Sequence, residues 1–215
     1  MTLSEKDQTL ISLLEPAPVV PLVQSNDPDE AVEISRALLD GGLAILEVVL
    51  RTDEAFACLK KICDTFPDVQ VGAGTVITPD QVERARDCGA KFIVSPGLTE
   101  GVVRTAQDND LPILPGIATA SELQTAYNYG LRTVKFFPAG LAGGPKMLKA
   151  LSSVFRDVRF MPTGGVNAAT LRDYLDIHAV LACGGSWLTP KDAIANKDFA
   201  AITSLAEDAL KIARG

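Results

Sequence analysis

The stretch TVKFFP, residues 133–138, is an apolar, β-favouring run that contains one lysine and ends at a proline. In a strand, successive side chains face opposite sides, so Thr133 and Phe137 share the side of Lys135. A lysine among apolar groups loses the hydration of its charged form, and the neutral amine is a nucleophile that can form a Schiff base with a carbonyl. The alternative is a lysine whose stem is buried and whose ammonium group reaches water.

Seven further apolar runs resemble this strand, and helical patterns separate them. We predict strands over residues 19–23, 45–50, 69–73, 92–95, 112–115, 133–137, 158–161 and 180–183. We predict helices over residues 4–14, 28–39, 53–66, 79–87, 99–109, 120–129, 146–154, 168–175 and 199–212. Eight β-α units in one chain of 215 residues favour a closed (β/α)8 TIM barrel, with residues 1–16 as an additional N-terminal helical segment. We expect residues 1–215 to form a single domain. An open doubly wound sheet is the alternative, but no glycine-rich dinucleotide fingerprint follows the first strand.

Composition excludes several classes of partner. The chain carries 27 acidic and 20 basic residues, giving a formal charge of −7, and the basic residues form no cluster. Binding to a nucleic acid backbone requires a basic surface, so we expect no nucleic acid partner. No apolar run approaches the roughly 18 residues that cross a bilayer, and no secretory signal begins the chain. The expected location is the cytoplasm, with no membrane partner.

The cysteines and the histidine do not predict a metal site. Cys58, Cys63, Cys88 and Cys183 form no CxxC pair, and His178 is the one histidine. We expect no metal and no cofactor, and we interpret the cysteines as buried, reduced thiols. An ordinary loop or packing role fits His178.

The second strand places a carboxylate and a guanidinium inside the barrel. Leu46, Val48 and Leu50 suit the outer face that helices cover, which turns Glu47 and Arg51 inward. Active sites of barrels lie where the carboxyl ends of the strands meet the following loops. A glutamate beside a desolvated lysine can relay protons, whereas a buried ion network is the structural alternative.

The third strand adds a residue to the end of the barrel where the carboxyl ends of the strands meet, which we call the mouth. By the same alternation, we expect Val71, Ala73 and Thr75 to face inward, with the intervening glycines allowing a ligand or neighbouring backbone to approach closely. The Thr75 hydroxyl and the Arg51 guanidinium could together hold a carboxylate.

Glycines after the last two strands indicate an anion site. Thr163-Gly164-Gly165 follows the seventh strand, and Gly184-Gly185-Ser186 follows the eighth. Barrels often bind phosphate at this position through backbone N–H groups and a helix N-terminus. Either glycine pair alone would more often be turn chemistry.

Seven segments together carry a family resemblance: Glu47, Arg51, Gly72-Ala73-Gly74-Thr75, Ser95-Pro96-Gly97, Lys135-Phe136-Phe137-Pro138, Pro162-Thr163-Gly164-Gly165 and Gly184-Gly185-Ser186-Trp187. From about residue 18 to the C-terminus, the chain resembles the 2-keto-3-deoxy-6-phosphogluconate (KDPG) and 4-hydroxy-2-oxoglutarate aldolases. The resemblance implies a (β/α)8 barrel, class I Schiff-base chemistry without a metal or cofactor, a small keto-acid phosphate as substrate, and a homotrimer.

The resemblance also implies residue roles. Lys135 would form the imine with the C2 carbonyl of the substrate, and Glu47 would act as the general acid/base. The substrate-binding residues would be Arg51 and Thr75 for the carboxylate, Pro96 and Phe137 for the pocket wall, and Gly164, Gly165, Gly185 and Ser186 for the distal phosphate, with Thr163 and Gly184 beside them.

Two positions depart from the family pattern. Val49 replaces a common threonine, so one hydroxyl near Glu47 is missing, and the loop Gly140-Leu141-Ala142 is more apolar than the glutamate-containing form. Cleavage of the galactonate epimer or of 4-hydroxy-2-oxoglutarate is an alternative, because the sequence does not fix the stereochemistry at C4. A phosphate-binding barrel isomerase that uses no imine and a non-enzymatic binding module are further alternatives.

Overall fold

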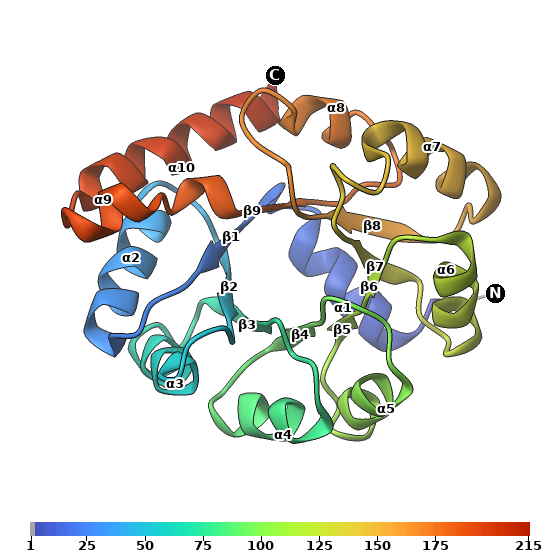
Figure 1. The fold of residues 1–215 in the computed structure, drawn as a ribbon, viewed down its shortest axis with the longest axis horizontal. Coiled ribbons are helices and arrows are strands. Elements are labelled where there is room, and N and C mark those ends of the chain that lie inside the picture. Colours follow the sequence, from blue (N-terminus) through green and yellow to red (C-terminus); the bar gives the residue numbers. More distant parts are fainter. Residues whose placement is uncertain (1–2) are drawn as a thin grey trace.

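The structure is a computed structural model that describes residues 3–215, so residues 1 and 2 of the predicted N-terminal segment lie outside it. Parallel strands form a central ring, and helices surround it (Figure 1). The strands are β1 Val19–Val23, β2 Ile45–Val49, β3 Gln70–Gly74, β4 Phe92–Val94, β5 Ile113–Leu114, β6 Gly116–Ile117, β7 Thr133–Phe136, β8 Arg159–Pro162 and β9 Cys183–Gly185. The helices are α1 Glu5–Leu14, α2 Pro28–Asp40, α3 Ala55–Thr65, α4 Pro79–Asp87, α5 Glu100–Asp108, α6 Ala120–Asn128, α7 Gly144–Val154, α8 Leu171–Leu175, η1 Ser186–Leu188 (a 3₁₀ helix), α9 Lys191–Ala195 and α10 Phe199–Arg214.

The ring is closed. Six strands form one sheet in the order β5-β4-β3-β2-β1-β9, and β6-β7-β8 form the second. Pro115 separates β5 from β6 because it has no N–H to donate, so these two segments are halves of one barrel strand. The Pro115 carbonyl accepts the Lys135 N–H at 3.0 Å, and bridges such as that between Thr163 and Gly184 join β8 to β9. The predicted eight-stranded (β/α)8 barrel is confirmed.

Alternation along the strands produces an inner and an outer core. Ile45 belongs to the cluster that fills the barrel, whereas Leu46 and Val48 belong to the cluster between strands and helices. Glu47, between these two residues, is fully buried on the inner side, where it reaches Lys135. The predicted orientation of β2 is therefore confirmed.

The predicted orientation of β3 is wrong. Val71 and Ala73 pack in the outer cluster, and Glu47 pairs in register with Gly72, so the two glycines of β3 face the interior. Hydrophobicity alone could not reveal this, because helices cover one face of a barrel strand and the packed interior covers the other. Thr75 still reaches the mouth because its φ of 60° turns the chain immediately after the strand.

The last barrel strand begins three residues and ends two residues later than predicted. We expected residues 180–183, but the hydrogen-bonded strand β9 includes both glycines, with Gly184 opposite Val20 and Gly185 opposite Pro21. Glycine disfavours strands, so the apolar run ahead of it dominated the prediction. Two short helices after β9, η1 and α9, were not predicted, because each has only one turn and no clear periodicity.

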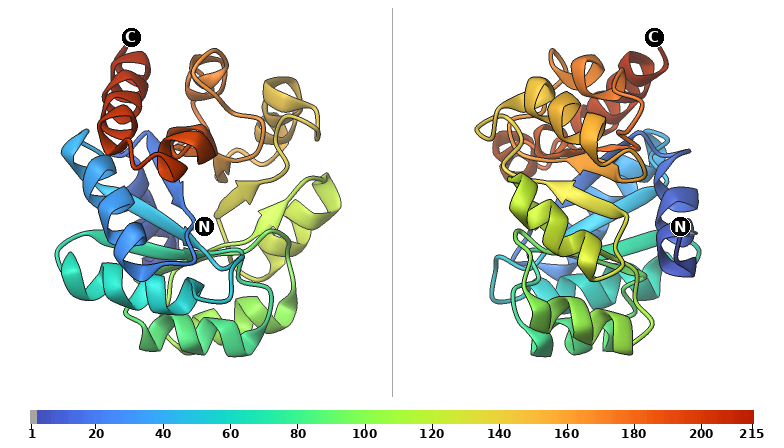
Figure 2. Two further views of the ribbon diagram at one scale, coloured as in Figure 1. Left: turned by 60° about the vertical axis from the view of Figure 1, so that its left-hand side comes forward. Right: turned by 90° about the vertical axis from the view of Figure 1, so that its right-hand side faces the viewer.

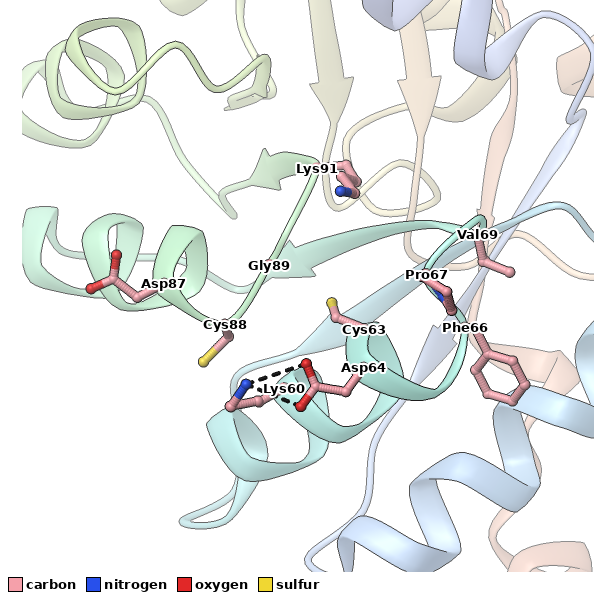
Figure 3. A pocket seen from close by; sticks show the side chains of 10 residues that line it. All are labelled: Lys60, Cys63, Asp64, Phe66, Pro67, Val69, Asp87, Cys88, Gly89 and Lys91. Carbon is pink, nitrogen blue, oxygen red and sulfur yellow. Dashed lines mark hydrogen bonds and ion pairs between the residues drawn. The ribbon is translucent and has the colours of Figure 1, made fainter.

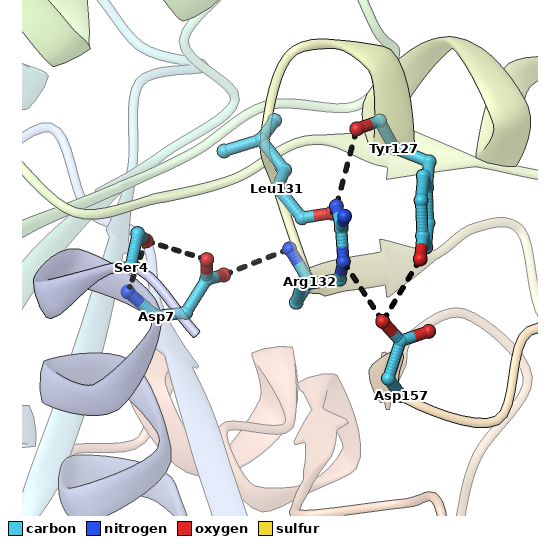
Figure 4. A network of polar contacts seen from close by, with 6 residues as sticks. All are labelled: Ser4, Asp7, Tyr127, Leu131, Arg132 and Asp157. Carbon is cyan, nitrogen blue, oxygen red and sulfur yellow. Dashed lines mark hydrogen bonds and ion pairs between the residues drawn. The ribbon is translucent and has the colours of Figure 1, made fainter. Parts of the chain in front are cut away.

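Helix α1 lies across one end of the barrel (Figures 1 and 2). Its Leu10 and Leu14 are part of the inner cluster, so the helix seals the interior with apolar side chains. The buried Asp7 carboxylate accepts the backbone N–H of Arg132 at 2.9 Å, and the Arg132 side chain bonds Asp157 at 3.1 Å (Figure 4). Because Arg132 directly precedes β7, this network ties the N-terminal helix to the strand that carries Lys135. No helix within residues 3–215 is long and apolar enough to cross a membrane.

Candidate active site

Lys135 and Glu47 meet inside the barrel. The Lys135 Nζ lies 3.4 Å from Glu47 Oε1, and their side chains are 2% and 0% exposed. The Lys135 Nζ also lies 5.4 Å from the centre of the Phe137 ring. Burying a charge without a partner is costly, so each residue offsets the cost of burying the other here. The arrangement brings a nucleophile and an acid/base within reach of one reacting carbon.

One oxygen of this pair has no protein partner. Within residues 3–215, Glu47 Oε2 is buried and accepts no hydrogen bond. A buried acceptor without a donor costs roughly 1–3 kcal/mol, and such atoms in an enzyme often await a substrate or water. The Glu47 carboxylate therefore has one oxygen for Lys135 and one free for a ligand hydroxyl.

Glycines in the two neighbouring strands, β3 and β6, allow close packing at the site. A Cβ at Gly74 would lie 2.2 Å from Glu47 Oε1, and a Cβ at Gly116 would lie 2.2 Å from the Pro96 carbonyl oxygen. Gly116 pairs in register with Lys135, so this contact brings Pro96 next to the strand of the lysine. Sequence reasoning treated Gly74 only as a place of close approach and missed Gly116. A glycine inside a strand is the signal that could have identified both.

Arg51 and Thr75 form a second polar group at the mouth. The Arg51 Nε donates to Thr75 Oγ1 at 2.9 Å, and both residues follow the carboxyl ends of their strands. Thr75 adopts a positive φ, which is strained for a β-branched residue. Strain of this kind is common at binding sites. Arg51 retains its terminal guanidinium nitrogens for an anion, since only Nε is used by Thr75.

The ends of β8 and β9 lie side by side. A Cβ at Gly184 would lie 2.2 Å from Thr163 Oγ1, so only glycine fits opposite this threonine. The Thr163 hydroxyl is buried and lacks a hydrogen-bond partner within the described residues. Gly164 and Gly165 have φ values of 90° and 83°, which glycine adopts readily, and Gly164 lies against the Phe137 ring.

A cavity of about 440 Å³ opens at the mouth between β1, β2 and β9. Its wall consists of Leu22, Gln24, Val49, Arg51, Ser186, Thr189, Pro190, Lys191 and Ile194. Leu22 is the register partner of Glu47, so the cavity adjoins the layer that holds the buried pair. It brings Arg51 and Ser186 together, whereas Gly164 and Gly165 do not line it. Lys191 in its wall was missed by sequence reasoning.

A separate cavity lies beneath α3 and α4, away from the mouth (Figure 3). Cys63 and Cys88 line it, and burial raises the pKa of the Cys63 thiol to about 11 and also raises that of Cys88. Thiols of this kind stay protonated near pH 7 and are poor nucleophiles. Lys60, in the same wall, bonds Asp64 at 3.0 Å. This cavity therefore lacks the reactive groups found at the mouth.

The four cysteines are free, as the prediction of reduced thiols requires. Their predicted burial is only half right: Cys58 and Cys183 are buried, whereas Cys63 and Cys88 are partly exposed. Among residues 3–215, no three His, Cys, Asp or Glu side chains gather in a way that could hold a metal ion.

Comparison with known proteins agrees with this geometry. The family model described as "KDPG and KHG aldolase" matches residues 10–205. The KHG/KDPG aldolase of Escherichia coli K12 is 44% identical over 203 residues, covering 94% of this chain and 95% of the relative.

Two solved structures are similar in fold and sequence. The KDPG aldolase of Legionella pneumophila, with pyruvate captured as a covalent carbinolamine intermediate, has a TM-score of 0.89 and 41% identity, covering 92% of this chain and 96% of that chain. The KDPG aldolase of Zymomonas mobilis ZM4 with 3-phosphoglycerate has a TM-score of 0.89 and 40% identity, covering 94% and 95%. The chain is thus an aldolase, a carbon–carbon lyase, and it belongs to the KDPG and KHG aldolase family.

Proposed function

We propose that the protein cleaves 2-keto-3-deoxy-6-phosphogluconate reversibly to pyruvate and glyceraldehyde 3-phosphate through an imine at Lys135. The observation that carries this proposal is the buried Lys135–Glu47 pair, with 3.4 Å between nitrogen and oxygen. A primary amine and a carboxylate that share one apolar chamber are the two groups a Schiff-base aldolase needs.

Imine formation is the first stage. Lys135 gives a proton to Glu47, and its neutral amine adds to the C2 carbonyl of the keto acid. Glu47 returns this proton to the carbinolamine hydroxyl, which leaves as water, so a protonated imine and the Glu47 carboxylate remain. Arg51, held by Thr75, binds the carboxylate next to C2 and orients the carbonyl toward the amine.

Carbon–carbon cleavage follows. Glu47 takes the proton of the C4 hydroxyl, the C3–C4 electron pair moves to the imine, and the aldehyde leaves. Glu47 Oε2, which has no donor among residues 3–215, is the available acceptor for that proton. The remaining enamine is protonated at C3, and water hydrolyses the imine to release pyruvate and the lysine. Pro96 and Phe137 shape the wall of the chamber.

The distal phosphate lies at the mouth in this proposal. The groups that bind it are Gly164, Gly165, Gly184, Gly185 and Ser186, together with Thr163, whose hydroxyl has no partner in the described part of the chain. The similarity to the Zymomonas mobilis aldolase with 3-phosphoglycerate supports a phosphorylated ligand.

Coupled detection of pyruvate tests this function. Wild-type protein should release pyruvate from the phosphorylated six-carbon keto acid, and Lys135→Met should release none. Retained turnover in Lys135→Met would favour an isomerase or another mechanism without an imine. A circular dichroism spectrum equal to that of wild type would establish that the variant is folded.

A second substrate is 4-hydroxy-2-oxoglutarate, because the Escherichia coli relative is described as a KHG/KDPG aldolase. The same imine chemistry cleaves it to pyruvate and glyoxylate. Ranking kcat/KM for the two keto acids, and for the galactonate epimer, decides which substrate is preferred.

A further inference from the structure

The mouth cavity contains two cationic side chains and no carboxylate. Arg51 and Lys191 both line it, and none of its lining residues is Asp or Glu. The whole chain, by contrast, carries a formal charge of −7. An opening lined by one sign of charge concentrates ligands of the opposite sign, so this cavity attracts anions within an acidic protein.

Lys191 is fixed in the cavity wall by the segment that precedes it. The Thr189 hydroxyl donates to the Leu22 carbonyl at the end of β1, at 2.9 Å, and Leu188 is fully buried. Residues 189–194 therefore stay attached to the rim of the barrel. Lys191 takes part in none of the ion pairs found within residues 3–215.

Arg51 and Lys191 occupy different positions in the cavity and suit different ends of the substrate. Arg51 is bonded to Thr75 and lies two residues beyond the end of β2, the strand of Glu47, which assigns it to the carboxylate beside the reacting carbonyl. Lys191 lies beyond Ser186, on the segment that follows β9. The substrate proposed above carries one anionic group at each end, so a second cation in the same cavity suits the far end.

We infer that Lys191 is a specificity-determining residue that selects 2-keto acids with an anionic tail. The inference rests on the proposed aldolase function. Phosphate and carboxylate tails share the chemistry that an ammonium recognises, and Lys191 acts on both, more strongly on the doubly charged phosphate. Because Lys191 is exposed, its effect falls as ionic strength rises.

The kinetic test compares three variants. Lys191→Gln removes the charge, Lys191→Arg restores it, and Lys149→Gln removes a charge from α7, where Lys149 lies by His178 and away from the mouth. The measured quantity is kcat/KM for the phosphorylated six-carbon keto acid divided by that for its unphosphorylated form. Lys191→Gln should lower this ratio about fivefold, through KM, as expected for one partly screened charge. The other two variants should keep the wild-type ratio.

The outcome is decided by that ratio and by its salt dependence. In wild type the ratio should decrease as the salt concentration is raised, and in Lys191→Gln it should decrease less. An unchanged ratio in Lys191→Gln, or an equal loss with both substrates, overturns the inference.

Binding of inorganic phosphate separates this inference from the aldolase proposal. Broadening of the ³¹P signal should be weaker with Lys191→Gln than with wild type or Lys149→Gln. If wild type shows no aldolase activity but its phosphate binding depends on Lys191, the aldolase proposal fails and the anion site stands. If wild type cleaves the keto acid and phosphate binding does not depend on Lys191, the inference fails and the aldolase proposal stands.

Discussion

Glu47 Oε1 lies 3.4 Å from Lys135 Nζ, although 88 positions separate the two residues in the chain and they come from β2 and β7. The closed barrel makes this contact possible, because strands distant in sequence point their inner side chains into one chamber. Gly74 leaves room for the Glu47 carboxylate, and α1 closes the chamber from the other end. The pair is therefore a product of the whole ring.

Removing one member of the pair should destabilise the protein more than removing both. Glu47→Gln or Lys135→Met leaves one charge buried without its partner, and each should lower the free energy of unfolding by about 3 kcal/mol. The double variant should recover most of this loss. Urea denaturation of all four proteins measures the coupling, and strictly additive losses would show that the pair does not interact.

The space at Gly74 should be essential. In Gly74→Ala the new methyl group would lie 2.2 Å from Glu47 Oε1, so the carboxylate must move. We expect a loss of stability of about 1–3 kcal/mol from overpacking, and a loss of kcat of tenfold or more because Glu47 is displaced. Gly97→Ala is the matched control, since a Cβ there meets nothing within 4 Å. Wild-type kcat in Gly74→Ala would show that Glu47 needs no fixed position.

The sequence predicted the barrel and the second strand well, for a physical reason. Eight apolar runs between helical patterns leave few alternatives, and in β2 two charged residues mark the inner face. In β3 no charge distinguishes the faces, and Val71 was assigned to the wrong one. The final strand was predicted too early in the chain because its own glycines disfavour strands. Gly184 is required there because the Thr163 side chain lies beside it, and this contact exists only in the folded chain.

The mouth was harder to predict than the interior. Lys191 reaches the cavity on a segment whose Thr189 is bonded to Leu22, a contact between residues 167 positions apart. Neither the sequence around Lys191 nor the one-turn helix α9 that begins there predicts that Lys191 lies at the cavity. Long-range contacts of this type depend on the assembled fold.

The link between α1 and β7 should contribute measurably to stability. Asp7→Ala leaves the buried N–H of Arg132 without its carboxylate acceptor, which costs about 1–3 kcal/mol. Asp7→Asn keeps an acceptor oxygen and should lose less. Urea denaturation distinguishes the two variants, and equal losses would mean that the charge of the carboxylate, and not the acceptor oxygen that Asp7→Asn keeps, stabilises this link.

Glu122 should stabilise the protein at neutral pH and lose this effect in acid. The N–H of Ala118, followed by the hydroxyl and N–H of Thr119, lowers the pKa of the Glu122 carboxyl below its usual 4.5, against the opposing effect of burial. Its stabilising contribution is thus present above pH 4.5 and is lost as the pH falls through the lowered pKa.

Glu122→Gln keeps the capping geometry and removes this titration. The decrease in unfolding free energy between pH 6 and pH 3 should therefore be smaller than in wild type, by less than about 1 kcal/mol because the group is largely solvated. Glu207→Gln, on the exposed face of α10, controls for the loss of one charge. A pH dependence equal to that of wild type would contradict the effect assigned to the capping bonds.

The most direct test of the central claim is reductive trapping. Wild-type protein is incubated with pyruvate and borohydride, digested, and analysed by mass spectrometry of the peptides. Our account predicts one stable pyruvate adduct on Lys135, absent from Lys135→Met and absent when either reagent is omitted. An adduct on another lysine, or none at all in protein that still cleaves the keto acid, would contradict it.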